Sequence, residues 1–185
     1  MRKILSMLLV SAMCCGLLVG CGGDSSVYKL PHNEEVGLNA SSKDIVKKDH
    51  LVELTKEHPS YEYLNQISDS YENAEEEFGT QYVKEEGEKV LINGYEFSLS
   101  YVIHKKDGLK QARYRGSNID ESGKKELLDY LTEKYGEEIK NSEFALYSEY
   151  HEIKVEDGEK KFVIEFGIPQ NFQDELWIVV IQSKM

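Results

Sequence analysis

The side chains that are able to do chemistry are scattered along this chain rather than grouped in motifs. Its five histidines spread from His32 to His151, and none belongs to a His-Glu-x-x-His zinc motif. His151 and Glu152 would point to opposite faces of a strand, which argues against a shared site. The sequence also contains no Gly-x-Ser-x-Gly nucleophile motif and no phosphate-cradling glycine loop. It therefore predicts no catalytic residue, no metal ligand, no cofactor and no enzyme.

Acidic side chains offer a second route to chemistry. Asp69 and the group Glu75–Glu77 can be interpreted as paired carboxylates for glycoside hydrolysis, or as a cation site. The chain has 34 acidic residues, however, so coincidental pairs are expected and a solvated helix face explains the group better. An envelope-polymer hydrolase or metal-dependent enzyme is kept as an alternative, and it predicts a deep pocket in which acids or histidines converge.

The N-terminus has the layout of a secretory signal. Arg2 and Lys3 precede a mostly apolar run from Ile4 to Val19, and polar residues 22–26 follow. The run is shorter than the roughly 20 residues that span a bilayer comfortably.

The end of this run, Leu18-Val19-Gly20-Cys21, resembles the lipobox of bacterial lipoproteins. The resemblance implies that residues 1–20 are a signal peptide, that the Cys21 thiol is diacylglycerylated, and that Cys21 starts the mature chain. Because two acyl chains give stable anchoring, we expect attachment to the cell membrane at its extracytoplasmic face through the lipid on Cys21. An ordinary secreted protein or an uncleaved anchor is the alternative. The other two cysteines leave with the signal, so the mature domain has no disulfide.

The net charge of the mature chain limits the classes of partner that it can bind. Removal of residues 1–20 leaves 20 basic residues (22 minus 2) against 34 acidic ones, a formal charge of −14. Nucleic-acid binding needs clustered positive charge, so we expect no nucleic-acid partner. Anionic lipid should also repel the domain.

The spacing of apolar residues predicts three helices. Polar residues 21–42 predict a flexible linker, which one globular domain follows over residues 43–185. A Ser-x-x-Asp start at Ser41 opens the first helix, whose apolar stripe runs to Leu54 and which Pro59 ends. Intervals of three and four predict the second helix over residues 60–78 and the third over residues 118–135.

From residue 81 the apolar period changes to two, which is typical of strands. Asn-Gly or Asp-Gly pairs at 93–94, 107–108 and 157–158 predict hairpin turns. A further hairpin is predicted around Glu86-Gly87, between residues 82–83 and 90–92. Residues 176–181 are apolar on both faces, so they should form a central strand. Together these elements predict an α+β fold with an antiparallel sheet of about six strands and two to three helices on one face.

An internal repeat is visible at the helix ends. Glu76-Glu77-Phe78-Gly79 and Glu133-Lys134-Tyr135-Gly136 are offset by 57 residues, and extended segments follow each. We interpret them as an αβββ duplication with half-repeats 60–116 and 118–183. This architecture resembles the duplicated helix-plus-meander folds of PepSY domains and of the beta-lactamase-inhibitor protein. The resemblance implies binding to other proteins rather than catalysis, and it carries no residues across.

Aromatic residues supply the remaining clue, because the chain contains 12 tyrosines and recognition surfaces are enriched in them. The alternative is that tyrosine is simply favoured in strands. The leading hypothesis is a non-catalytic lipoprotein that binds an extracytoplasmic protein or peptide through an uncovered sheet face; a structural or ligand-sequestering lipoprotein is the alternative. The candidate binding residues, expected to form a concave patch with Ser98 and Ser100, are Tyr114, Tyr147, Tyr150, Trp177, Arg113 and Arg115.

Overall fold

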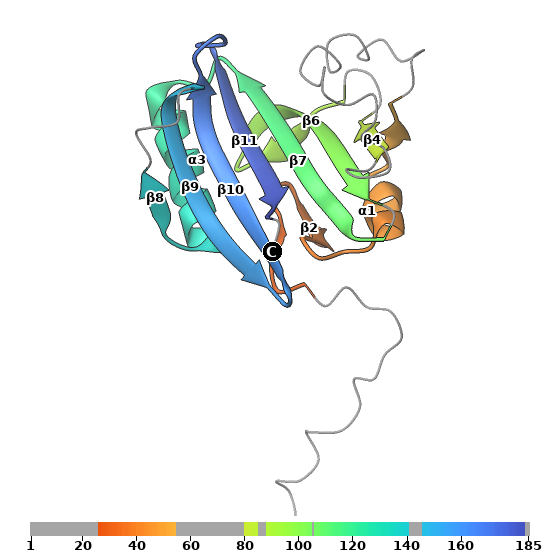
Figure 1. Cartoon of the computed structure of the whole chain (residues 1–185). Helices are drawn as coiled ribbons and strands as arrows, with labels where there is room; N and C mark the ends of the chain where they lie inside the picture. Colours follow the sequence, from red (N-terminus) through yellow and green to blue (C-terminus); the bar gives the residue numbers. More distant parts are fainter. Residues whose placement is uncertain (1–25, 55–79, 85–87, 105, 141–145, 184–185) are drawn as a thin grey trace, which may run out of the picture.

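A nine-stranded antiparallel sheet forms the centre of the molecule (Figure 1). The computed structural model describes residues 26–54, 80–84, 88–104, 106–140 and 146–183. The strand order is β3-β4-β6-β7-β11-β10-β9-β8, and β5 pairs with β6. The strands are β3 (Val52–Glu53), β4 (Thr80–Val83), β5 (Val90–Ile92), β6 (Tyr95–His104), β7 (Gly108–Ser117), β8 (Glu138–Lys140), β9 (Tyr147–Asp157), β10 (Lys160–Pro169) and β11 (Glu175–Gln182).

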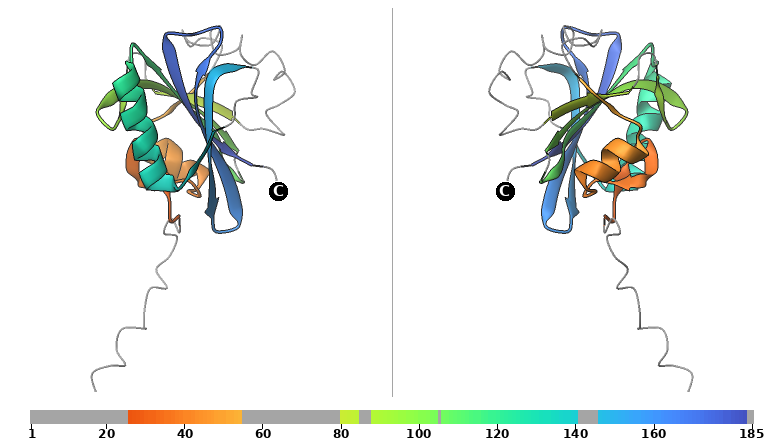
Figure 2. Two further views of the ribbon diagram at one scale, coloured as in Figure 1. Left: turned by 90° about the vertical axis from the view of Figure 1, so that its left-hand side faces the viewer. Right: turned by 90° about the vertical axis from the view of Figure 1, so that its right-hand side faces the viewer.

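One face of the sheet carries all the other described elements (Figure 2). They are a small hairpin of β1 (Lys29–Leu30) and β2 (Asn33–Gly37), and the helices α1 (Ser42–Lys48) and α3 (Glu121–Tyr135). The mixed α+β class is therefore confirmed. The strand count is higher than expected, because short edge strands such as β3 and β8 are too brief to leave a periodic pattern in the sequence.

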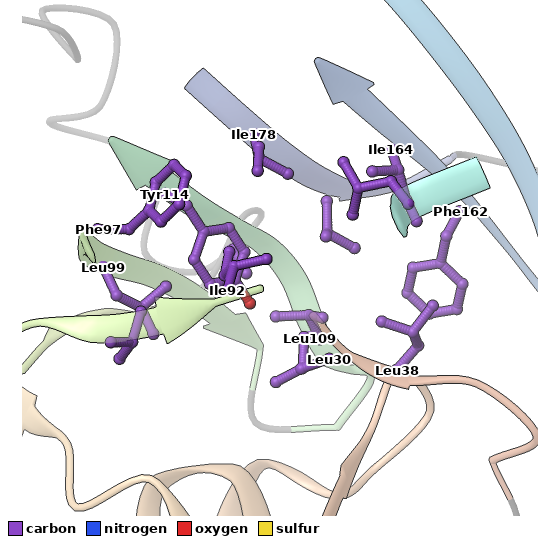
Figure 3. Close-up of a cluster of buried hydrophobic side chains, with 14 of the residues drawn as sticks. Leu30, Leu38, Ile92, Phe97, Leu99, Leu109, Tyr114, Phe162, Ile164 and Ile178 are labelled. Carbon is purple, nitrogen blue, oxygen red and sulfur yellow. The ribbon is translucent and has the colours of Figure 1, made fainter. Parts of the chain in front are cut away.

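The core lies between this face of the sheet and the elements that cover it. Alternate residues of the long strands point into it, as the period of two requires. Figure 3 shows how side chains from the sheet meet side chains from the N-terminal hairpin. The labelled residues, all at most 5% exposed, are Leu30, Leu38, Ile92, Phe97, Leu99, Leu109, Tyr114, Phe162, Ile164 and Ile178.

Three predicted hairpin turns are confirmed. Asn93 and Gly94 both have positive φ (48° and 86°), and Gly108 and Gly158 have φ of 78° and 66°. The hairpin predicted around Glu86-Gly87 is wrong. The two flanking segments pair with β6 instead of with each other, β5 along its first half and β4 along its second. Because β6 is ten residues long, both β5 and β4 can pair with it, one after the other.

The third predicted helix is confirmed as α3. Asp120 caps its N-terminus by accepting a hydrogen bond from the Gly123 N–H at 2.8 Å, and Gly136 (φ 119°) follows its last residue. The first predicted helix is too long: α1 ends at Lys48, and Val52–Glu53 pair with β4 as β3. The second, over residues 60–78, lies outside the described residues.

The flexible linker predicted over residues 21–42 is wrong from Ser26 onward. Leu30, Val36 and Leu38 are fully buried, so this segment belongs to the fold and helps to close the core beside α3. The Tyr130 hydroxyl also donates to the Pro31 carbonyl at 2.9 Å. Apolar residues spaced this widely in a polar stretch give no periodic signal. No helix in the described part of the chain is long and apolar enough to cross a membrane.

Candidate functional site on the open sheet face

The sheet face opposite the helices carries most of the predicted binding residues. Strand register places Tyr150, Gly167, Trp177 and Arg115 in one row across β9, β10, β11 and β7. Directly opposed residues of antiparallel strands share a face, so this row lies on one side. We call this surface the open face, because no helix among the described residues lies on it (Figure 2). Its central side chains are Tyr147, Tyr150, Glu152, Glu165, Trp177, Arg113 and Arg115.

Trp177 is fixed by its neighbours. The Phe172 ring stacks on it with centroids 5.8 Å apart, and the Arg113 guanidinium lies 5.3 Å from its ring centroid. The indole N–H donates to the Glu175 carboxylate at 2.6 Å. These contacts leave Trp177 9% exposed and Phe172 36% exposed. The apolar surface that a partner can reach is therefore Phe172 more than Trp177.

The two tyrosines form a second aromatic pair beside it. The ring centroids of Tyr147 and Tyr150 are 5.1 Å apart. A Cβ at Gly167 would lie 2.7 Å from Tyr147 Cδ1 and 2.5 Å from the Glu149 carbonyl oxygen. Only glycine therefore allows Tyr147 to lie across β10. Burial, with the nearby charge of Glu165, raises the pKa of Tyr147 to about 12, so its hydroxyl keeps its proton at neutral pH.

Carboxylates and guanidinium groups meet between these aromatic pairs. Glu152 and Glu165 stand opposite each other in the register, and the Tyr150 hydroxyl lies 3.1 Å and 3.0 Å from their carboxylates. Burial raises the pKa of Glu165 and outweighs the hydrogen bond from Tyr150; the charge of Glu152 adds to the rise, and Arg113 opposes it. The open face thus combines two aromatic pairs with carboxylates and guanidinium groups, but Tyr150 (3% exposed) and Trp177 are buried in it, while Tyr147 and Phe172 are partly exposed.

The structure brings Tyr147, Tyr150, Trp177, Arg113 and Arg115 together on this face, with Ser98 and Ser100 opposite the two arginines on β6. Tyr114 does not belong to the surface and is a correction. It is fully buried on the core face, opposite Leu99 and Ile178. The physical reason is alternation, since a residue between Arg113 and Arg115 on a strand must point to the other side.

A buried polar cluster on the core face has no counterpart in the sequence analysis. Asp49 is 1% exposed and accepts hydrogen bonds from His32 Nε2 at 3.0 Å, from Asn33 Nδ2 at 2.5 Å and from the Tyr101 hydroxyl. The Nδ1 atom of His32 lies 3.0 Å from the Tyr114 hydroxyl oxygen. We call these five residues the Asp49 cluster. It joins the hairpin β1–β2 and the end of α1 to strands β6 and β7.

The Asp49 cluster is built to hold a carboxylate rather than to react. Burial by itself would raise the pKa of Asp49, but the hydrogen bonds from His32, Tyr101 and Asn33 and the charge of His32 keep it below its ordinary value. The series of contacts from Tyr114 to His32 and from His32 to Asp49 resembles that of a nucleophile, a general base and the acid that orients the base. Tyr114 is completely buried, however, so a substrate has no access to its hydroxyl. We therefore interpret the Asp49 cluster as a set of buried hydrogen bonds that holds the β1–β2 hairpin and the end of α1 against strands β6 and β7.

The remaining histidines and acids are dispersed. His151 lies on the core side, 3.1 Å from a carboxylate oxygen of Glu138 and 3.1 Å from one of Glu149. His104 lies beside Asp107 in the β6–β7 turn. Within the described ranges, no three His, Cys, Asp or Glu side chains are grouped so that they could hold a metal ion. Asp69 and Glu75–Glu77 lie outside those ranges.

The chain matches no protein-family model, no curated protein and no solved structure. Function is therefore inferred from the geometry of the open face and from the N-terminal sequence.

Proposed function

We propose that this protein is a membrane-anchored extracytoplasmic lipoprotein that binds a protein or peptide through the open face and is not an enzyme. The observation that carries the proposal is the convergence of the partly exposed rings of Tyr147 and Phe172, which pack on the buried Tyr150 and Trp177, with paired carboxylates and guanidinium groups. Aromatic residues and arginine are enriched at the centres of protein interfaces, where rings supply contact area and charges supply specificity.

The chemistry of the partner follows from the accessible part of this face. Leu146 is 69% exposed and Phe172 is 36% exposed; their segments are joined by the hydrogen bond from the Gln170 N–H to the Leu146 carbonyl at 2.9 Å. A partner that places an apolar side chain here brings its neighbouring polar groups over Arg113 and Glu165. This combination suits a peptide segment with mixed apolar and charged residues.

The anchor is the second part of the proposal. The layout of residues 1–26 supports lipidation of Cys21, and the lipid places the domain at the extracytoplasmic face of the cell membrane.

The third part of the proposal concerns the evolutionary origin of the fold. The sheet consists of two meanders, one of β4, β6 and β7 and the other of β9 to β11, and they meet where β7 pairs with β11. This meeting supports a duplicated helix-plus-meander unit similar to those of PepSY domains.

Site-specific photo-crosslinking in living cells tests the binding surface. A crosslinking amino acid replaces Phe172 on the open face or, as the matched control, Leu91, which is 60% exposed on β5. We expect a defined adduct from position 172 and none of the same mass from position 91. An Arg113→Glu change should reduce the adduct at position 172 at unchanged protein level and unchanged circular dichroism.

Two results would count against the open face. One is the same adduct in equal yield from positions 172 and 91. The other is an adduct at position 172 that Arg113→Glu leaves unchanged in a folded protein. Either result would move the binding surface elsewhere on the domain.

A further inference from the structure

The N-terminal segment enters the folded domain at one end of the sheet. The Val27 N–H donates to the Asp157 carboxylate at 2.9 Å, at the turn between β9 and β10. The Lys160 ammonium donates to the Asp107 carbonyl at 2.6 Å, which brings the β6–β7 turn to the same place (Figure 1). We call this group the anchor end; it comprises Ser26–Val27, Lys106–Gly108 and Asp157–Lys160.

The tether between lipid and domain is short. Ser26 follows Cys21 by five residues, and five residues span at most about 18 Å even when fully extended. Because residues 26–42 belong to the fold, they add nothing to the reach. A lipid on Cys21 therefore holds the anchor end next to the headgroups.

The binding residues of the open face lie toward the opposite end. Gly167, which separates Tyr150 from Trp177 in the register, is seven residues along β10 from Lys160, or roughly 23 Å at the usual rise of a strand. The loop between β10 and β11, which contains Phe172, lies at the end of the sheet opposite the β9–β10 turn (Figure 1). The anchor and the aromatic surface are thus separated by most of the length of the sheet.

We propose that the lipid on Cys21 holds the domain upright, with the anchor end against its own membrane and the Phe172 end of the open face away from it. This inference rests on the proposed lipidation of Cys21. It deepens the proposed function, because it assigns the partner: a protein segment presented roughly 20–30 Å above the bilayer, rather than a lipid headgroup.

The surface of the anchor end fits this placement. Val27 is 77% exposed there. In the β6–β7 turn, Asp107 is flanked by Lys110 Nζ and His104 Nδ1, each 2.9 Å from its Oδ2. Lys110 offsets the charge of Asp107, so this pair carries little net charge in a chain of net charge −12, and anionic lipid repels it less than it repels the rest of the domain. Glu159 is also exposed at this end, so the tether and not charge sets the orientation.

Energy transfer from the domain to the membrane tests the orientation. The mature chain has no thiol besides Cys21, so Glu159→Cys at the anchor end and Gln173→Cys at the opposite end each accept one donor dye. The lipidated mature proteins, which begin at Cys21, are reconstituted in phosphatidylglycerol–phosphatidylethanolamine vesicles with an acceptor dye on the headgroups. We expect about twofold or more greater transfer from position 159, because the two loops are separated by roughly 30 Å along β10.

A longer tether is the matched control. Twenty Gly/Ser residues inserted between Ser25 and Ser26 add a mean reach of about 25 Å, and they should lower the transfer from position 159 to that from position 173. Equal transfer from both positions with the native tether, in protein that sediments with the vesicles, would overturn the upright orientation and leave the anchor intact. Recovery of the protein in the supernatant would overturn the anchor, and this inference with it.

Discussion

Asp49→Ala is the substitution that most directly tests how the N-terminal segment is held on the sheet. Asp49 accepts hydrogen bonds from His32, Asn33 and Tyr101, which belong to the β1–β2 hairpin and to β6. Alanine removes the acceptor without adding bulk. The His32 ring and the Tyr101 hydroxyl are then buried without the group that satisfied them.

The expected loss of stability follows from these contacts. A buried donor that loses its partner costs about 1–3 kcal/mol, so two such donors cost about 4 kcal/mol together. This figure agrees with the roughly 3–5 kcal/mol lost when one member of a buried charged pair is removed. It is a large part of the total stability of an ordinary domain, which is about 5–15 kcal/mol. Asp49→Asn keeps one acceptor oxygen and should lose about half as much.

Urea unfolding of a soluble chain that starts at residue 22 measures this loss. Trp177 is the only tryptophan and lies on the other face of the sheet, so its fluorescence reports unfolding without contact with the substituted site. The control is Asp129→Ala, which removes an exposed pair with Lys125 and should leave the urea midpoint nearly unchanged, because solvent screens such a pair. If Asp49→Ala stays within about 1 kcal/mol of the unaltered chain, the Asp49 cluster does not tie the segment down.

The contribution of Asp49 to the free energy of unfolding should depend on pH in a defined direction. The pKa of Asp49 is lowered in the folded state, so its contribution to stability is complete above its ordinary value of about 3.9 and is lost as the pH falls through the folded-state pKa. The difference in stability between the unaltered chain and Asp49→Asn should therefore be full at neutral pH. It should shrink below about pH 4. A difference that stays constant down to acid unfolding would show that the carboxylate charge plays no part.

Three further outcomes are expected. Gly167→Ala should cost about 1–3 kcal/mol in urea unfolding, because its methyl group would meet Tyr147 and the backbone of β9. Glu165→Gln should raise the urea midpoint at pH 7 but not below pH 4, since burial raises the pKa of Glu165 and its ionised form opposes folding only above the ordinary carboxyl pKa; an equal rise at both pH values would contradict this. Cys21→Ala should leave the protein unprocessed or release it from membranes on fractionation. A processed variant that stays stably membrane-bound would refute the lipidation.

Local chemistry in the sequence predicted α3 and three of the four hairpins. Asn93-Gly94 and Asp157-Gly158 specify tight turns through their own backbone preferences, which nearby residues do not alter. The helix at residues 121–135 likewise has its cap, its apolar stripe and its stop within one segment. The pairing of β7 with β11 joins segments about 60 residues apart, and no pattern within either strand specifies that neighbour.

The prediction of the candidate site was right where it followed the alternation of side chains along a strand and wrong where it did not. Arg113, Arg115 and Trp177 share a face because of their spacing and register, and the same rule excludes Tyr114. The Asp49 cluster was beyond prediction for a different reason. His32, Asp49, Tyr101 and Tyr114 come from four separate segments, namely the β1–β2 turn, the residue after α1, β6 and β7. The cluster therefore exists only after the chain has folded, and each residue alone resembles an ordinary polar position.

The N-terminal segment shows why composition misplaced the start of the domain. A boundary at residue 43 would remove Leu30, Val36 and Leu38, three fully buried side chains that each contribute about 1.5–3 kcal/mol through burial. It would also remove His32 and leave the Asp49 carboxylate inside the core without that partner. Glu34 and Glu35 between these positions are exposed, and the polar composition made the stretch resemble a linker. If Cys21 carries the proposed lipid, the residues that close the core are also the ones that shorten the tether, so the stability of the fold and the proposed height of the open face above the membrane depend on the same segment.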